Sequence, residues 1–395
     1  VCMDYNPFLP EVKANPYPYY AHLRRQAPVY HVEAAGLWAV SRYDDVLYVL
    51  RNPQLFSSTV LIAALLGDLN PVPEAANLIA SDPPVHSRLR KLVNRAFTPR
   101  LIAELEPRVR EITIALLPRV APQGEFDLAH DLSTPLPVIV IAEMLGVEPE
   151  HRVEFKRWSD DIVHAANGVS GEERDQAQRS VAEFRAYFEG AIDARRAEPR
   201  NDLISALVRA EEEQQMLTAA EILSLTTLLL IAGNETTTNL IGNAVLALLA
   251  HPDTLARVQR DPSLIPAVVE ETLRYDGPVQ GIFRQAIQDV ELSGTTIPAG
   301  SLVFPLFASA DRDERKFPDP DRFDITRNTD AHIAFGFGIH FCLGAPLARL
   351  EAKVALEEMV TRMCGWSHKE EKGTRIDSFF LRGLKTLPLT FQAQV

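Results

Sequence analysis

The sequence has few cysteines, no long apolar run and no excess of positive charge, and each absence excludes a class of protein. Only Cys2, Cys342 and Cys364 occur in 395 residues. They are too few and too scattered for a disulfide framework, which fits a reducing compartment. The longest apolar stretch, residues 222–233, is interrupted by a serine and two threonines and is too short to cross a bilayer. A net charge of −13 argues against nucleic acid or an anionic membrane as the main partner.

The rest of the composition is that of an ordinary globular protein. Hydrophobic residues make up 46% of the chain and charged residues 24%, which excludes disordered and fibrous classes. Residues 1–20 are polar, rich in proline and aromatic, without the pattern of a signal peptide or membrane anchor, so we expect a cytoplasmic protein. No internal repeat or low-complexity linker occurs. We therefore expect a single domain over residues 1–395.

Helical periodicity dominates the chain from residue 85 onward. An earlier helix is expected at 43–51, and others at roughly 85–97, 99–119, 133–145, 149–167, 171–197, 201–210, 218–250, 252–260, 262–276 and 345–363. Strand-like runs occur at 37–41, 279–292 and 301–307, and the tail from 379 is extended. The pattern predicts a mainly α fold with small peripheral β-sheets.

One cysteine stands in a glycine-punctuated loop, Phe335-Gly-Phe-Gly-Ile-His-Phe-Cys-Leu-Gly344, just before a helical run. The glycines allow a positive φ or a close approach of backbone to a large flat group. A thiolate ahead of a helix N-terminus gains from the helix dipole and from free amide donors. Phe335, Phe337 and Phe341 are expected to shield the sulfur. The loop therefore suits a metal-bound thiolate, although an ordinary buried cysteine in a turn fits the same residues.

The spacing F-x-x-G-x-[H/R]-x-C-x-G resembles the haem-thiolate signature of cytochrome P450s, with His340 in the basic position. The resemblance implies that Cys342 is the metal ligand and binds the iron of haem b.

A second motif lies in the long helix expected at 218–250: Ala232-Gly-Asn-Glu-Thr-Thr-Thr238. Glycine and threonine weaken the middle of an otherwise apolar helix, which favours a functional groove over a solvent-facing polar patch. The segment resembles the P450 motif [A/G]-G-x-[D/E]-T-[T/S]. By that resemblance Glu235 and Thr236 are the catalytic acid–alcohol pair beside bound dioxygen, with Glu235 relaying protons.

Two further motifs would support the cofactor. Glu271 and Arg274 share a helix face and resemble the structural Glu-x-x-Arg pair of P450s, for which Arg322 is the expected third member. His86 and Arg90 also share a helix face. They resemble the pair that binds a haem propionate, and Arg284 and His340 resemble its further propionate ligands. Taken singly, either pair could be an ordinary charged helix surface.

The motifs occur in the order typical of the family and cover nearly the whole chain, which is identified as a member of the soluble, bacterial, class I type. The resemblance implies monooxygenation of a lipophilic small molecule, with dioxygen as co-substrate. Electrons would come from NAD(P)H through a ferredoxin or flavodoxin and its reductase. Lys91, Arg95 and Arg349 are plausible contacts for that partner. We expect a monomer without nucleic-acid or membrane partners.

Substrate contacts are predicted from position and apolar character: the apolar loop 59–80, Ile162, Val163, Ala166, Leu229, Val279, Ile282, Phe379 and Phe380. Core packing explains each of them equally well. Two other activities stay open, a P450 peroxygenase or rearrangement enzyme and a non-catalytic haem-thiolate sensor. The presence of Glu235 and Thr236 counts against both.

Overall fold

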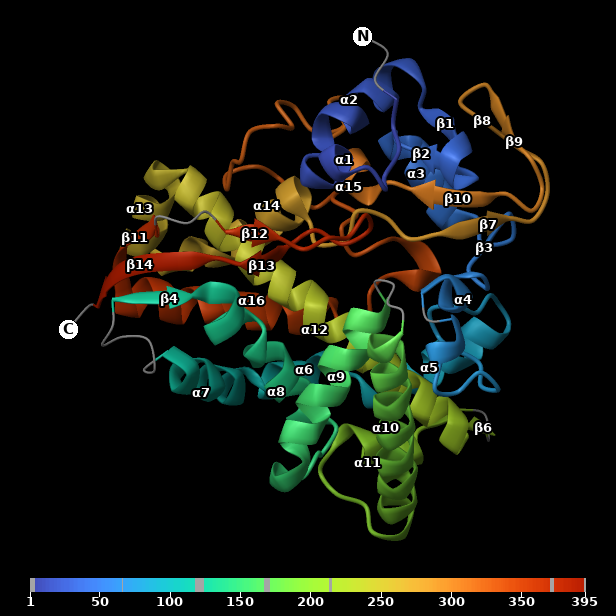
Figure 1. Ribbon diagram of the computed structural model, residues 1–395, viewed down its shortest axis with the longest axis vertical. Helices are drawn as coiled ribbons and strands as arrows, with labels where there is room; N and C mark the ends of the chain where they lie inside the picture. The colour runs from blue at the N-terminus through green and yellow to red at the C-terminus, as the bar shows by residue number, and fades with distance from the viewer. Residues whose placement is uncertain are drawn as a thin grey trace. The chain divides into compact units, whose positions relative to one another are not determined.

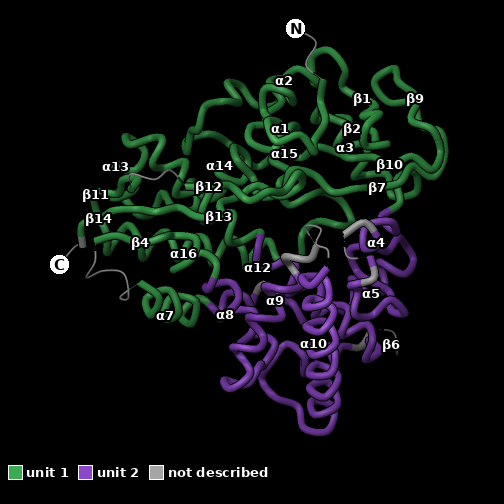
Figure 2. The backbone as a smooth tube through the Cα atoms, in the orientation of Figure 1, with its two compact units in different colours: residues 1–57, 106–134, 236–395 green, residues 58–105, 135–235 purple. Residues whose placement is uncertain are grey.

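The computed structural model describes residues 4–65, 67–117, 124–166, 171–212, 215–369 and 373–393. The chain divides into two compact units, which Figure 2 shows in green and purple. Unit 1 contains residues 1–57, 106–134 and 236–395, and unit 2 contains residues 58–105 and 135–235. The expectation of one domain over 1–395 stays a prediction.

Unit 1 combines helices with the main sheet of the described chain. Its helices are α1 (Pro10–Ala14), α2 (Tyr17–Gln26), α3 (Tyr43–Arg51), α7 (Glu106–Leu116), α13 (Pro252–Arg260), α14 (Ile265–Asp276), α15 (Phe307–Ala310) and α16 (Ala345–Arg362), with short turns η1 (Glu33–Ala35), η4 (Ala129–Ser133), η6 (Pro262–Leu264) and η7 (Gly338–His340). Prolines begin several of them, including Pro266 in α14 and Pro346 in α16, because the first turn needs no donor from these positions.

The main sheet of unit 1 has the strand order β1 (Val29–Val32), β2 (Leu37–Val40), β10 (Leu302–Pro305), β7 (Arg284–Ala286) and β3 (Phe56–Ser57). Within this sheet β10 and β2 pair in parallel and the other neighbours pair antiparallel. The pairing of β2 with β10 places residues far apart in sequence side by side (Figure 1). Smaller sheets join β11 (Met363–His368), β14 (Pro388–Ala393) and β4 (Glu125–Asp127), then β12 (Thr374–Arg375) with β13 (Leu384–Thr386), and β8 (Val290–Leu292) with β9 (Thr295–Ile297).

The core of this region lies between the main sheet and α3. Val46, Val49 and Leu50 of α3 are buried with Val40 and Val303 of the sheet. The apolar face of α3 recurs at helical spacing, so the helix buries one side against the strands. This packing also brings the C-terminal end of α3 to the loop that contains Cys342.

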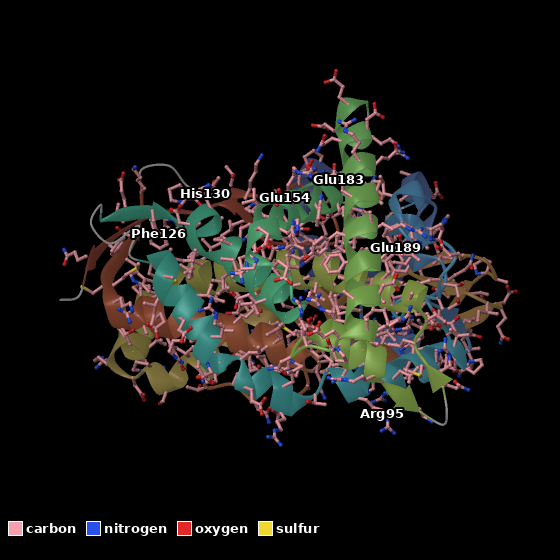
Figure 3. All side chains as sticks on the ribbon, turned by 90° about the horizontal axis from the view of Figure 1, so that it is seen from below. Arg95, Phe126, His130, Glu154, Glu183 and Glu189 are labelled. Carbon is pink, nitrogen blue, oxygen red and sulfur yellow. The ribbon has the colours of Figure 1, made fainter. Side chains whose placement is uncertain are left out.

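Unit 2 is mainly helical. It contains α4 (Leu61–Leu65), η2 (Gly67–Leu69), α5 (Val85–Ala96), α6 (Pro99–Glu104), α8 (Pro135–Met144), η5 (Pro149–His151), α9 (Arg152–Ala166), α10 (Glu172–Ala197) and α11 (Leu203–Arg209), with a hairpin of β5 (Glu211–Glu212) and β6 (Gln215–Met216). Glu183 and Glu189 mark α10 in Figure 3. Glu183 accepts a hydrogen bond from Trp158 Nε1 at 2.8 Å, which ties α9 to α10.

The longest helix, α12 (Ala219–Ala250), begins in unit 2 and continues into unit 1. Thr218 and Glu221 form a reciprocal cap at its start: Glu221 N donates to Thr218 Oγ1 at 3.1 Å, and Thr218 N donates to Glu221 Oε2 at 2.9 Å. The helix is unbroken through the Gly233–Thr238 segment, so the weak helix formers there do not interrupt it.

The fold class and most helices agree with the sequence-based predictions, and α3 and α13 match theirs residue for residue. Three predictions about elements were wrong, and two helices were not predicted. The helix at 99–119 is divided, because Pro107 cannot continue α6 and stands instead in the first turn of a new helix, α7. The run at 279–292 is two strands belonging to different sheets. The segment 59–80 contains helical turns, and α1 and α2 were missed. Among the residues that the structure describes, no helix combines the length and apolar character that a membrane span requires.

Candidate active site

The Cys342 loop is a tight turn held by its own backbone. Cys342 N donates to Phe335 O at 3.0 Å, which closes the loop on itself, and α16 begins three residues after the cysteine. The side chain of Cys342 is half-buried. The loop therefore presents the sulfur ahead of a helix N-terminus, as the sequence predicted, where a thiolate is stabilised.

Two glycines are required by this turn. Gly336 and Gly338 have φ of 72° and 71°, in the left-handed region. A Cβ on Gly338 would come within 2.9 Å of Leu50 O, so the loop lies directly against the end of α3. Gly344 differs, because its φ is −81° and a Cβ there would make an ordinary 3.9 Å contact with Cys342 Sγ.

The expected shielding of the sulfur by three phenylalanines is only partly right. Phe335 packs near Phe341, with ring centroids 6.4 Å apart. However, Phe337 is 37% exposed and Phe341 is 42% exposed. These two rings form part of the surface, and they line a groove of about 510 Å³ together with Tyr43 and Ile333.

Glu271 and Arg274 form a fully buried, two-point ion pair in α14, with both contacts at 2.8 Å. Arg274 also donates to the carbonyls of Asp311, Pro320 and Arg322. The prediction that the Arg322 guanidinium joins this pair was wrong, because that side chain is 66% exposed and pairs with Asp324.

Arg327 supplies the third charge instead. Its Nε lies 3.5 Å from Glu271 Oε1, and its side chain is 10% exposed. Arg327 follows Arg322 in the same irregular segment, so only the path of the backbone distinguishes the two. If every basic residue of that segment had been considered as the third charge, Arg327 would have been among the candidates.

The other predicted cofactor ligands of unit 1 occupy separate elements. Arg284 begins β7, is 5% exposed and donates from Nη1 to Phe283 O at 2.8 Å. His340 lies in the η7 turn two residues before Cys342 and is half-buried. A guanidinium buried to this extent is best accommodated beside an anionic group.

The unit 1 part of α12 is anchored by polar side chains. Thr238 Oγ1 donates to Ser133 O at 2.8 Å. Asn243 Nδ2 donates to Asp276 O and Arg382 O at 2.8 and 2.9 Å. These buried hydrogen bonds fix the rotation of the helix about its axis, and thereby the direction in which Thr236 points.

Glu235 ends the unit 2 part of the same helix. Burial raises the pKa of its carboxyl group to about 7, so the group exchanges protons near neutral pH. The neighbouring residues fix this stretch, because Asn234 Nδ2 donates to Ser159 Oγ at 2.6 Å. A Cβ on Gly233 would come within 2.4 Å of Ile141 Cδ1, so the helix lies close to α8 there.

His86 and Arg90 lie one turn apart on α5 in unit 2, on the same helix face. His86 is 2% exposed. Burial, and then the positive charge of Arg90, lower the pKa of the imidazole. Near neutral pH the pair therefore combines a neutral imidazole with a guanidinium, a set of donors that suits a carboxylate.

The structure thus divides the seven predicted site residues between the units. Thr236, Arg284, His340 and Cys342 belong to unit 1, and His86, Arg90 and Glu235 belong to unit 2. Their roles stay predictions.

Two other groups of residues were predicted from the sequence, the contacts for a redox partner and the contacts for the substrate, and the structure agrees with each group only in part. Arg349 pairs at two points with Glu270, so its charge is already engaged. Lys91 and Arg95 are exposed on α5, and Arg95 projects outward in Figure 3. Phe379 packs against the rings of Phe8, Phe283, Phe304 and Phe380, which favours a packing role over substrate contact. The side chains of Val163 and Ala166 lie outside the described residues.

The residues present fit haem b. Cys342 offers a soft sulfur donor in a preformed loop, the ligand type that haem-thiolate proteins use. The buried Arg284 and the His86–Arg90 pair are suited to carboxylates, the charged groups of this cofactor.

Comparisons with known proteins agree with this chemistry. The family described as Cytochrome P450 matches residues 13–263 and 261–393. The chain is 41% identical to cytochrome P450 monooxygenase PikC of Streptomyces venezuelae, over 96% of this chain and 92% of that protein. It is 48% identical to the solved structure of CYP109Q5 from Chondromyces apiculatus, with a TM-score of 0.92 and 99% of both chains covered.

A further solved structure, CYP109E1 from Bacillus megaterium in complex with testosterone, is 40% identical to this chain. The TM-score is 0.87, and the match covers 95% of this chain and 99% of that one. Matches of this identity over nearly the whole length establish common descent as well as a common fold. The chain belongs to the cytochrome P450 family.

Proposed function

We propose that this cytochrome P450 monooxygenase, whose cofactor is haem b, inserts one atom of dioxygen into a lipophilic small molecule by hydroxylation or epoxidation. The single observation that carries the site assignment is the closed Cys342 loop ahead of α16. The proposal treats residues 1–395 as one functional domain, monomeric and cytoplasmic.

Each predicted site residue then has a role toward the cofactor. Bound haem supplies the oxygen-activating iron, and a thiolate ligand makes that iron electron-rich. Cys342 would bind the iron through its sulfur. His86, Arg90, Arg284 and His340 would hold the propionates by charge-assisted hydrogen bonds.

Glu235 and Thr236 would control protons. A carboxyl group whose pKa is about 7 can both accept a proton from water and pass it on near neutral pH, which is the requirement for a general acid. Thr236 would position a water molecule by its hydroxyl group, and the anchors at Thr238 and Asn243 would keep that hydroxyl in place.

The substrate is proposed to be lipophilic and of small-molecule size. The apolar candidates on the chain support this: Ile162 is buried, and Val279 and Ile282 are partly buried hydrophobic residues. A relative solved with testosterone supports a rigid, apolar ring compound as one substrate class.

Electrons are proposed to come from NAD(P)H through a reductase and a ferredoxin or flavodoxin. The exposed rings of Phe337 and Phe341 and the groove of about 510 Å³ beside them would form part of the docking surface, since they flank Cys342. Exposed aromatic residues of this kind are typical of interface centres. Arg349 contributes less than predicted from sequence because it already pairs with Glu270.

Reduction of the purified protein under carbon monoxide tests the assignment of the ligand. The wild type is expected to give the Soret band of thiolate-ligated haem, and Cys342→Ser is expected to lose it completely. Cys364→Ser is the matched control, since Cys364 is half-buried in β11 and its Sγ hydrogen-bonds Gln392 O. An unaltered band in Cys342→Ser would disprove the ligand assignment.

A further inference from the structure

One carboxylate of unit 1 joins three segments around the Cys342 loop. Glu270 Oε1 accepts from Arg349 Nε at 2.6 Å, and Glu270 Oε2 accepts from Arg349 Nη2 at 2.9 Å. Glu270 Oε2 also lies 2.9 Å from His332 Nε2. Glu270 belongs to α14 and Arg349 to α16, whereas His332 lies in the segment that leads into the loop. The carboxylate therefore connects the chain before Cys342 with the helix after it.

The protons of this cluster can be assigned from its geometry. Ala334 N can only donate, and it lies 3.3 Å from His332 Nδ1, so Nδ1 is the acceptor. The hydrogen of the neutral ring is then on Nε2, where it is donated to Glu270. The side chain of His332 is 5% exposed and that of Glu270 is 28% exposed, so the imidazole end of this hydrogen bond is shielded from water.

The charge of Glu270 is also assured. Burial by itself would raise the pKa of the carboxyl group, but the hydrogen bonds from His332 and Arg349 outweigh it and lower the pKa to about 2. The carboxylate is thus an anion over the whole working range, and both of its neighbours are held by a charge-assisted hydrogen bond.

A chain of contacts leads from the cluster to the cysteine. The Arg349 guanidinium lies 4.6 Å from the centre of the Phe335 ring, in a cation–π contact. Phe335 O accepts the Cys342 N–H at 3.0 Å. Any movement of Arg349 therefore reaches Phe335, whose backbone closes the cysteine loop.

We propose that Glu270 is a positioning residue for Cys342. It fixes the segment before the cysteine through His332 and the segment after it through Arg349, and so keeps the sulfur in the place where it can bind iron. The inference rests on the proposed role of Cys342. It is separate from the neighbouring Glu271–Arg274 pair, which holds α14 to the carbonyls of Asp311, Pro320 and Arg322.

The test uses the haem-loaded enzyme and the variant Glu270→Gln, which keeps the size of the side chain and removes its charge. Two quantities are measured: the half-time for loss of the thiolate Soret band of the reduced carbon monoxide complex in mild denaturant, and the midpoint reduction potential of the iron. We expect the half-time to fall about tenfold, as for the loss of a partly buried charge pair, and the potential to shift. Arg349→Lys, which keeps the charge but loses the planar fork, should give an intermediate half-time.

Glu358→Gln is the matched control. Glu358 is a buried carboxylate of α16, the helix that also carries Arg349, and accepts from Arg110 and Arg362 at 2.7 and 2.8 Å. Its loss should lower the melting temperature but leave the reduction potential and the half-time of the band unchanged.

The proposal is overturned if Glu270→Gln and Arg349→Lys keep the wild-type potential and half-time. It is also overturned if both variants lower the melting temperature, as the control does, and shorten the half-time only to the extent that this loss of stability explains, with the potential unchanged. Cys342→Ser separates this outcome from failure of the ligand assignment. A lost band in Cys342→Ser together with unchanged Glu270 variants would disprove the positioning role alone.

Discussion

The carboxylates of α14 and the carboxylate at the centre of α12 have opposite surroundings. In α14, Glu270 and Glu271 each contact at least one arginine, and the pKa of Glu270 is lowered to about 2. In α12, burial raises the pKa of Glu235 to about 7, and no charge among the described residues contributes to that shift. Glu270 is therefore an anion at neutral pH, whereas Glu235 titrates near neutral pH.

This difference matches what each region is proposed to do. A loop that presents a metal ligand has to stay in one conformation, and buried, fully paired ions provide directional contacts that resist movement. A proton relay has to change its charge during each cycle, which a strongly paired carboxylate cannot do at neutral pH. In the proposed roles, the same residue type would therefore serve for rigidity in α14 and for proton transfer in α12.

The largest effect is expected from breaking the α14 pair. Glu271→Gln leaves the fully buried guanidinium of Arg274 without its carboxylate, which should lower the free energy of unfolding by about 3–5 kcal/mol. Denaturant unfolding of the purified protein measures this free energy. The yield of haem-loaded protein is a second readout. Arg327→Ala should destabilise less, and Arg322→Ala should have no measurable effect because its side chain faces solvent. Equal losses in the two arginine variants would contradict the assignment of Arg327 as the third charge.

An intermediate effect is expected from removing the titrating acid of α12. Because the carboxyl of Glu235 is protonated below its pKa of about 7 and ionised above it, product formation by the wild type should decline as pH rises through about 7. Glu235→Gln should lower product formed per NADH at least about tenfold and remove that inflection. Thr236→Ala should also lose product while peroxide rises, but keep the inflection. A wild-type pH profile in Glu235→Gln would rule out the relay role.

The smallest effect concerns an acid of α16 that resembles Glu235 in its surroundings. Glu351 is 1% exposed, its Oε2 has no hydrogen-bond partner among the described residues, and burial raises the pKa to about 8. A raised pKa contributes stability that is complete below the ordinary carboxyl pKa and is lost as pH rises through about 8. The melting temperature of the wild type should therefore fall relative to Glu351→Gln between about pH 6 and pH 9, by roughly 1–3 °C. A difference in melting temperature between wild type and Glu351→Gln that does not change with pH would show that Glu351 does not titrate in this range.

Elements whose signals are local were predicted well. The helix α13 begins at Pro252 and α12 at the Thr218–Glu221 cap, and both were visible as residue patterns. The division of the run at 279–292 into two strands was not visible in the sequence, because strands of both sheets share the same alternation of side chains. Which sheet each strand joins depends on the strand with which it pairs. The missed helices α1 and α2 did carry a signal, since a proline stands in the first turn of each.

The candidate site shows the same limit. Glu235, Thr236 and the Cys342 loop could be predicted because each motif is contiguous, and their roles stay predictions. Arg327 and the Glu270–His332–Arg349 cluster were missed, because their members come from different segments of the chain. Arg349 was even interpreted as a surface cation, since nothing in its own neighbourhood indicates the partner on α14.

By itself, the sequence determined the family of this protein, the cofactor type and the order of its helices, because these depend on short motifs and on periodic burial. The tertiary structure alone decided which charges are paired. Two carboxylates of identical chemistry acquire a pKa of about 2 at Glu270 and about 7 at Glu235. The reason is that a pKa depends on the dielectric surroundings and on charges within a few ångströms, and those neighbours are supplied by folding.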